Sequence, residues 1–486
     1  MAQIFDPTSL LMVLLVIASA GVRDLVSCMS TEAYWKAKGV EVSVAQLGRN
    51  LQPTKAVDIS RLVADLDADD PREREAATTK IAAIGAAALP ALEKAMKNGS
   101  PEVVTRARVL SARIGAASKA TAVRRLMAIR TLGELKDPKG LDLLQPLVES
   151  SEMFEADYAR AAIAKIQGKS YVQPAASQAM RQAEIGLLPA QIDSVMQVAP
   201  GLEGDFSIEK TINRLPLDEN QKIHVKDEAN EKLLELLETV GNVRIDALTW
   251  GFNAAPPTKP GNTILIARGQ FDATAVCDFL GKLVARSRTL DGSNVYEIND
   301  DTALLVSGDR RIVFLSREPT GDLAMETMAT ALKKGAGSFA DNAALSKLVK
   351  SIDIKSPLWA AGRLSPGLAE IVGPLGDFDS ATLTATQRLN DKKSLVTELT
   401  LSAIGSDAAK TKKTAEETRQ LLTSVVETGR KQEQALPFLK PAVDFMQSVK
   451  VEVDGTKATA TGSMDDQPLL PLVIPVQGSA VQWLLR

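Results

Sequence analysis

Hydrophobic positions between residues 59 and 166 follow the spacing of α-helices. Apolar side chains recur at i, i+3, i+4 and i+7 in the segments 59–66, 77–88, 89–96 and 103–114, which places each set on one helix face. Asp70 before Pro71 and Ser100 before Pro101 are typical of helix starts, because an N-cap side chain precedes a residue with a helical φ. This pattern predicts short helices joined by tight turns.

Two of these segments are similar in sequence. Residues 105–114 align with residues 157–166, and four aligned pairs are identical: Ala107/Ala159, Arg108/Arg160, Ala112/Ala164 and Ile114/Ile166. Upstream, Ile84-Gly85 aligns with Leu132-Gly133. The region resembles HEAT-like repeats of the short bacterial type, most clearly in AAIGAAALPALEKAM, SPEVVTRARVLSARIG, AIRTLGELKDPKGLDLLQPLV and YARAAIAKI. The resemblance implies an N-terminal HEAT-like α-solenoid, whose stacked helices present a surface to another protein.

Beyond residue 185 the apolar positions change to the alternation of β-strands. Leu248, Trp250 and Phe252 alternate along one strand, and Asp454-Gly455 is a favoured hairpin turn. Strands, a helix and further strands occur in this order twice. We therefore expect a multidomain α and α+β protein, in which two β-β-α-β-β pseudo-repeats follow the solenoid and helices cover one face of antiparallel sheets. Whether the two units form one continuous sheet stays open. The order of elements also resembles that of large exported bacterial proteins, which join HEAT-like repeats to a tandem α+β domain of unassigned function.

These changes of pattern divide the 486 residues into six segments. They are a signal-like apolar segment and N-terminal cap at 1–50, HEAT-like helical repeats at 51–168, a linker at 169–184, a first α+β unit with preceding helices at 185–363, a second α+β unit at 364–466, and an apolar, proline-containing tail at 467–486.

The N-terminal sequence indicates in which cellular compartment the protein lies. Residues 10–20 form an uncharged apolar run that ends in the small-x-small pattern of Ala18 and Ala20, as in signal peptides. This favours the periplasm or cell envelope of a bacterium. No basic residue precedes the run and Asp6 does, so a helix buried on the first repeat of a cytoplasmic protein is the alternative. Cys28 ends a sequence similar to a lipobox, but Arg23 and Asp24 interrupt the apolar stretch that such a signal needs.

The C-terminal tail is the second apolar segment. Residues 467–485 carry no charge and contain three prolines, which prevent a spanning helix. We expect the tail to pack on the sheet. The alternative is peripheral membrane contact through Trp483 and Arg486, or through the N-terminal segment.

Composition argues against several classes of function. Lys+Arg 57 against Asp+Glu 60 gives a net charge of −3, which excludes a globally basic nucleic-acid binder. One His and two Cys exclude a disulfide framework and most histidine-based metal or triad chemistry. No catalytic, cofactor-binding or metal-ligating residue is assigned, and no cofactor is expected. We therefore expect a non-enzymatic scaffold protein; a hydrolase whose site is assembled from distant carboxylates is the remote alternative.

One stretch is strongly basic. Residues 103–133 contain no acid, and their cations include Arg106, Arg113, Arg124 and Arg130. We expect a solvated helix face whose arginines pair with the nearby acids of the segments DADD and ERE. Two alternatives remain: the face binds another protein, or it binds the phosphates of nucleic acid or another anionic surface. The stretch holds no aromatic residue on which bases could stack, which argues against single-strand binding and favours another protein as the partner.

Overall fold

The structure is a computed structural model, and it divides into two compact units. The α+β unit comprises Met1–Cys28, Pro174–Ala229 and Val243–Arg486, and the helical unit comprises Met29–Gln173 and Asn230–Asn242. The structure describes residues 24–51, 59–169, 171, 177–199, 212–213, 218–253, 263–284, 286–299, 302–316, 325–363, 378–389, 395–432 and 440–465. The apolar run at 10–20, residues 170 and 172–176 of the predicted linker, and the tail at 467–486 lie outside these residues.

The helical unit is built from helices whose starts the sequence predicted. Asp70 accepts a hydrogen bond from the Arg72 N–H at 2.8 Å, and Ser100 accepts one from the Val103 N–H at 3.3 Å, so both predicted N-caps are confirmed. The helices are α3 (Thr31–Ala37), α4 (Val44–Asn50), α5 (Ser60–Ala64), α6 (Pro71–Ile84), α7 (Leu89–Asn98), α8 (Pro101–Leu135), α9 (Gly140–Leu144) and α10 (Glu155–Ile166).

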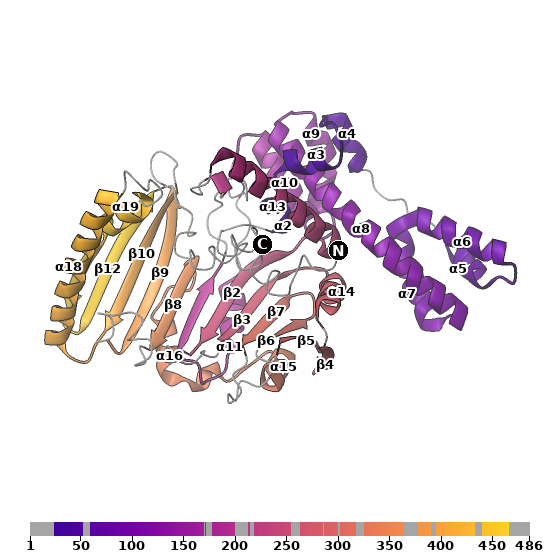
Figure 1. Cartoon of the computed structure of the whole chain (residues 1–486). Helices are drawn as coiled ribbons and strands as arrows, with labels where there is room; N and C mark the ends of the chain where they lie inside the picture. Colours follow the sequence, from indigo (N-terminus) through magenta and orange to yellow (C-terminus); the bar gives the residue numbers. More distant parts are fainter. Residues whose placement is uncertain are drawn as a thin grey trace. The chain divides into compact units, whose positions relative to one another are not determined.

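The long helix α8 corrects the expectation of short helices throughout. Its 35 residues run without a turn past Ile114, where the sequence predicted a helix end. Residues 115–122 read GAASKATA, and because alanine is the best helix former and proline is absent, nothing in them ends the helix. Leu110 and Ile114 pack with α5, α6 and α7, whereas the second half of α8 packs with α3, α4 and α10. One helix therefore serves two hydrophobic clusters (Figure 1).

The aligned glycines of the proposed repeat occupy different structural positions. Gly85 ends α6 with φ of +71°, a conformation that glycine adopts without strain. Gly133 lies inside α8, against Ala162 of α10. The alignment of Ile84-Gly85 with Leu132-Gly133 is therefore a likeness of sequence and not of local structure.

The strands of the α+β unit form one continuous antiparallel sheet, which answers the question that the sequence left open. The order is β11-β12-β10-β9-β8-β1-β2-β3-β7-β6-β5-β4, visible from left to right in Figure 1. The strands are β1 (Ser194–Val198), β2 (Arg244–Phe252), β3 (Thr263–Gln270), β4 (Arg286–Leu290), β5 (Ser293–Asn299), β6 (Thr302–Ser307), β7 (Arg311–Ser316), β8 (Leu358–Arg363), β9 (Ser380–Leu389), β10 (Leu395–Ile404), β11 (Lys450–Asp454) and β12 (Lys457–Asp465).

Strand β1, which the sequence analysis missed, joins the two halves of the sheet. It pairs with β2 on one side and with β8 on the other. In chain order, three strands, β1–β3, therefore stand where the pattern predicted two, and the same holds for β8–β10. The predicted hairpin at Asp454-Gly455 is confirmed: it connects β11 to β12, and Gly455 has φ of +59°.

Helices cover both faces of the sheet, and not one face as predicted. Helices α11 (Gln178–Gly186), α15 (Met325–Lys334) and α16 (Ala343–Lys350) share a core with Val195, Ile266 and Trp359. On the neighbouring strand β9, Thr384 pairs with Trp359 and projects from the same face. The face that α11, α15 and α16 cover is therefore polar where it reaches β9. Helix α18 (Ala408–Gln432) packs on the other face, against Ala403. The strands of the first half are apolar on both faces, as in ILIA of β3, and therefore need cover on both.

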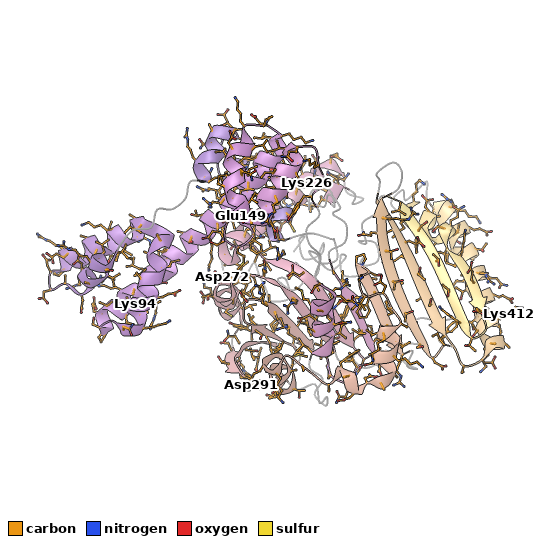
Figure 2. All side chains as sticks on the ribbon, turned by 180° about the vertical axis from the view of Figure 1, so that it is seen from behind. Lys94, Glu149, Lys226, Asp272, Asp291 and Lys412 are labelled. Carbon is orange, nitrogen blue, oxygen red and sulfur yellow. The ribbon has the colours of Figure 1, made fainter. Side chains whose placement is uncertain are left out.

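Helix α14 (Ala273–Leu283) lies on the same face of the sheet as α18. Its N-cap Asp272 accepts a hydrogen bond from the Ala275 N–H at 2.9 Å and is labelled in Figure 2. A Cβ at Gly281 would lie 3.9 Å from the ring of Tyr296, and Tyr296 projects from the face opposite to Val295 of the α11 core because side chains alternate along a strand.

Candidate functional site

The basic residues of α8 fall into two groups. At 100° per residue, Arg106, Arg113 and Arg124 lie within about 20° of one line along the helix, whereas Arg130 is turned away by about 120°. Arg113 and Arg124 are exposed, and 11 residues of helix separate them by about 16 Å. The structure therefore brings three of the four predicted residues onto one face and places the fourth elsewhere.

Two of the four arginines are engaged in ion pairs at the ends of α8. The Arg106 Nε lies 2.6 Å from the Glu102 carboxylate, and the Arg130 Nε lies 3.1 Å from that of Glu134. Arg130 also donates to the backbone carbonyl of Met29 at 2.6 Å. Each pair has the i,i+4 spacing that stabilises helices. Arg106 and Arg130 thus make contacts that hold the helical unit together.

A third arginine, which was not among the predicted site residues, clamps α8 to α10. The Arg125 guanidinium binds both carboxylate oxygens of Glu155, at 2.5 and 3.2 Å. Glu155 is only 5% exposed, so its charge is compensated by a forked contact of the kind that arginine forms best. This pair is part of the packing between helices and is not open to a partner.

Arg124 lies beside a buried tyrosine of α3. Burial raises the pKa of Tyr34, and a hydrogen bond and the positive charge of Arg124 oppose that rise, whereas the charge of Glu238 adds to it. Tyr34 packs edge-on against Trp35, with ring centroids 5.0 Å apart. The ring is 1% exposed, so it offers no platform on which a nucleic-acid base could stack.

The middle of α8 is open on its surface. Between Ile114 and Val123 every described side chain is exposed or half-buried, because the two hydrophobic clusters end on either side of it. Ala117 is exposed there and lies within about 40° of Arg113 and about 20° of Arg124 around the helix. We call Arg113, Ala117 and Arg124 the α8 stripe. No acid occurs in residues 103–133, so the stripe is positive throughout.

A buried charge network in the α+β unit escaped the sequence analysis. Glu184 of α11 is fully buried and accepts hydrogen bonds from Arg311 at 2.9 Å and from Arg268 at 2.6 Å. Its only sequence signal is an arginine inside each of two apolar strands, ILIARGQ and RIVFLS. Because the carboxylate is neutralised from two strands, this network fixes α11 on the sheet.

The buried arginine of α11 has neutral hydrogen-bond partners. Arg181 donates to the Gln197 side chain at 2.7 Å and to the Ser356 carbonyl at 2.6 Å. Burial lowers its pKa to about 10, which leaves the guanidinium protonated at neutral pH. The contacts join α11 to β1 and to the segment before β8, and they too are structural.

Asp246 occupies a β-bulge, where the pairing of β2 with β3 slips between Ile245 and Ala247. Its carboxylate lies 3.0 Å from the Arg244 Nε. Burial raises the pKa of Asp246, and the charges of Arg244, Arg268 and Arg310 oppose that rise. Three arginines therefore act on this carboxylate.

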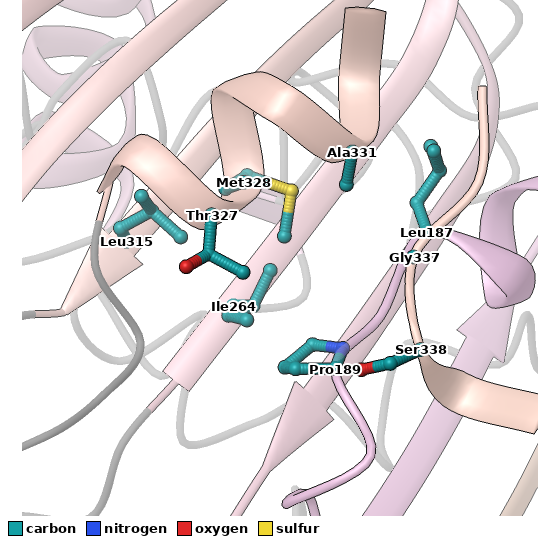
Figure 3. A pocket seen from close by; sticks show the side chains of 9 residues that line it. All are labelled: Leu187, Pro189, Ile264, Leu315, Thr327, Met328, Ala331, Gly337 and Ser338. Atoms are coloured by element: carbon teal, nitrogen blue, oxygen red, sulfur yellow. The ribbon is translucent and has the colours of Figure 1, made fainter. Parts of the chain in front are cut away.

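A small pocket lies between the sheet and α15. Figure 3 shows Ile264 and Leu315 of the sheet beneath Met328 of α15. The Ser338 hydroxyl at its rim already accepts the Ala190 N–H at 2.9 Å. None of the lining residues is titratable; they are Leu187, Pro189, Ile264, Leu315, Thr327, Met328, Ala331, Gly337 and Ser338.

The described residues contain no group of three or more His, Cys, Asp or Glu side chains arranged to hold a metal ion. His224, the only histidine of the sequence, is exposed on α13 (Glu219–Val240). Cys28, in the short helix α2 (Leu25–Cys28), is buried, and its thiol donates to the Asp24 carbonyl at 3.5 Å. None of the helices in the described ranges combines the length and apolar character needed to cross a membrane.

Comparison with known proteins gives only a weak structural likeness. No protein-family model matches the chain, and a search of curated proteins found no match. Two solved structures of TP0453, crystal forms IV and I, align with 60% of this chain and with 95% and 97% of theirs. Both are 14% identical to it, with TM-scores of 0.33 and 0.32. Likeness at this level assigns neither fold nor function to the chain.

Proposed function

We propose that this chain is a non-enzymatic scaffold protein that binds an acidic surface of another protein through the α8 stripe. The observation that carries the proposal is the open middle of α8, where described side chains between the two clusters stay unburied and the flanking acids Glu102 and Glu134 are used by Arg106 and Arg130. Arg113 is thereby left to an outside carboxylate, and the exposed Arg124, which also holds a hydrogen bond with Tyr34, offers its positive charge to the same partner.

The HEAT-like character of the helical unit and its compartment are parts of the same proposal. The antiparallel succession of α6, α7 and the first half of α8 around one core supports a repeat of stacked helices. A place in the periplasm or cell envelope rests on the apolar residues 10–20. Mass spectrometry of the native N-terminus tests it: a mature chain that begins near residue 21 supports export, and an intact Met1 overturns it.

We also infer that the sheet consists of two related units, as the sequence pattern indicated. The third strand of each half, β3 or β10, is followed by a helix on the same face, α14 or α18, and pairs with the last strand, β7 or β12. The hairpin β4–β5 is then an insertion in the first unit. The inference supports a platform role for this domain, because its strands pair continuously from β11 to β4.

A photo-cross-linking experiment tests the binding proposal. A photoreactive residue at Ala117 lies on the stripe, and one at Ala122 lies about 160° from the Arg106 line on the same helix; both alanines are exposed. In the native cell, the residue at position 117 should give a protein adduct of discrete mass that the residue at position 122 does not give. Nuclease treatment should leave that adduct unchanged.

Charge reversal supplies the matched control. The double variant Arg113→Glu/Arg124→Glu should abolish the adduct, whereas Arg108→Glu should retain it, because Arg108 is equally exposed but lies about 200° from Arg106. Equal cross-linking from both positions, or retention in the double variant, would overturn the proposal. An adduct that nuclease removes would instead assign the stripe to nucleic acid.

A further inference from the structure

The two edges of the sheet differ in how they are protected. The sheet ends at β11 on one side and at β4 on the other. At the β11 edge, Arg419 of α18 donates to the Val451 carbonyl from Nη2 at 2.7 Å and from Nε at 3.2 Å. One backbone acceptor of that edge is therefore occupied by a side chain of the same chain, which hinders the addition of another strand.

The β4 edge has no such cover among the described residues. Its backbone pairs with β5 and with no strand on the outer side, and the four residues Arg286 to Thr289 are exposed. The strand is nevertheless held firmly by Asp291 in the turn after it, which is labelled in Figure 2. The Asp291 carboxylate binds Thr330 and Lys333 of α15, each at 2.9 Å. A fixed row of free N–H and C=O groups is a template for an additional strand.

The charges along β4 decide which kind of strand fits. Arg286 and Arg288 project on one face, opposite Glu297 and Val295 of β5. Arg288 lies 3.6 Å from Glu297 and 3.3 Å from Glu326, whereas no described acid forms an ion pair with Arg286. A strand added outside β4 would meet two cations spaced two residues apart.

A second copy of this chain does not suit the edge. The antiparallel register that pairs all five residues of β4 with themselves places Arg288 opposite Arg288 of the other copy. Like charges directly opposite one another in a sheet are destabilising. An added strand with carboxylates at alternate positions would instead place an acid beside each arginine.

We propose that β4 is a docking edge that binds an extended acidic segment of another protein by strand addition. Backbone hydrogen bonds to β4 supply the pairing, and carboxylates at alternate positions select the register against Arg286 and Arg288. This surface is independent of the α8 stripe, and the failure of either proposal leaves the other standing.

The test uses the full chain and the acetylated, amidated peptide TEVEVET as a probe. Calorimetry measures binding, and hydrogen exchange read by mass spectrometry locates it. We expect slower amide exchange in residues 286–290 with the peptide bound, and unchanged exchange in residues 450–454 at the other edge. The double variant Arg286→Glu/Arg288→Glu should bind roughly tenfold more weakly, because both cross-strand pairs become repulsive.

Two modified peptides separate strand addition from attraction of charge alone. A peptide N-methylated at every second residue, made in both registers, keeps its charges and loses the backbone donors of one edge; at least one of the two should fail to bind. A scrambled peptide of the same composition should bind more weakly than the probe. Equal binding of all peptides, or no protection of residues 286–290, would overturn the proposal and leave the arginines as charges that only block edge-to-edge pairing.

Discussion

Gly133 of α8 lies directly against Ala162 of α10. A Cβ at Gly133 would come within 2.8 Å of the Ala162 Cα and 2.9 Å of its Cβ, so the two helices approach as closely as a glycine allows. We expect Gly133→Ala to lower the free energy of unfolding by about 1–3 kcal/mol, because overpacking outweighs the gain in helix propensity. Urea unfolding followed by Trp35 fluorescence measures the change.

Gly115 provides the matched control in the same helix. A Cβ there meets nothing within 4 Å, so Gly115→Ala should raise stability by about 0.5–1 kcal/mol through helix propensity alone. Equal changes in the free energy of unfolding for Gly133→Ala and Gly115→Ala would show that the close approach to Ala162 leaves no cost for a Cβ at Gly133.

The network at Glu184 predicts a large loss of stability. Glu184→Gln would leave Arg268 and Arg311 without their shared carboxylate, and removal of one partner from a buried ion pair costs about 3–5 kcal/mol. Chemical denaturation of the α+β unit gives the value. Glu417→Gln, which removes an exposed partner 3.7 Å from Lys413, should change stability by less than about 1 kcal/mol.

Asp246 predicts a pH-dependent difference between the wild type and Asp246→Asn. Burial raises the folded-state pKa of Asp246 above its ordinary value of 3.8, so the unfolded chain releases this proton first as the pH rises. The contribution of Asp246 to stability is then complete below that ordinary value and falls as the pH rises through the folded-state pKa. Relative to the wild type, the Asn variant should gain stability from acid to neutral pH. The measurement is the free energy of unfolding of both proteins as a function of pH, and a constant difference between them across this range would contradict the prediction.

The pKa of Tyr34 should respond in opposite directions to two substitutions. Arg124 lowers this pKa and Glu238 raises it, so Arg124→Ala should raise it further and Glu238→Gln should reduce it. Alkaline titration of the Tyr34 ring by NMR distinguishes it from the other three tyrosines. Arg113→Ala, on the same stripe but without contact to the ring, serves as the control and should leave the titration unchanged.

Local signals in the sequence were enough to place many elements. The N-caps Asp70 and Ser100 and the hairpin at Asp454-Gly455 each depend on residues within one turn of the chain, and all three are confirmed. The continuity of α8 was missed because the apolar periodicity of residues 103–114 ends at Ile114, although the alanines that follow sustain the helix. Strand β1 has only five residues, and it forms no tight hairpin with the next strand, the signal that identified the equally short β11.

The candidate site was predictable only in part. The pairing of Arg106 with Glu102 and of Arg130 with Glu134 has i,i+4 spacing, so the sequence contained the signal that separates them from Arg113 and Arg124. The contact of Arg124 with Tyr34 joins residues that are 90 positions apart in the chain. The network at Glu184 joins this residue to arginines that are 84 and 127 positions away. No periodicity reports such pairs, because the fold alone brings them together.

The central place of β1 has a consequence for any shortened form of this protein. A fragment that starts at residue 200 would keep eleven of the twelve strands and yet lose the one that bridges β2 and β8. The apolar strands β2 and β8 would then become exposed sheet edges, and each could pair with an exposed edge of a neighbouring molecule. Recombinant pieces cut at that point should be prone to aggregation, whereas pieces that begin before α11 should stay dispersed.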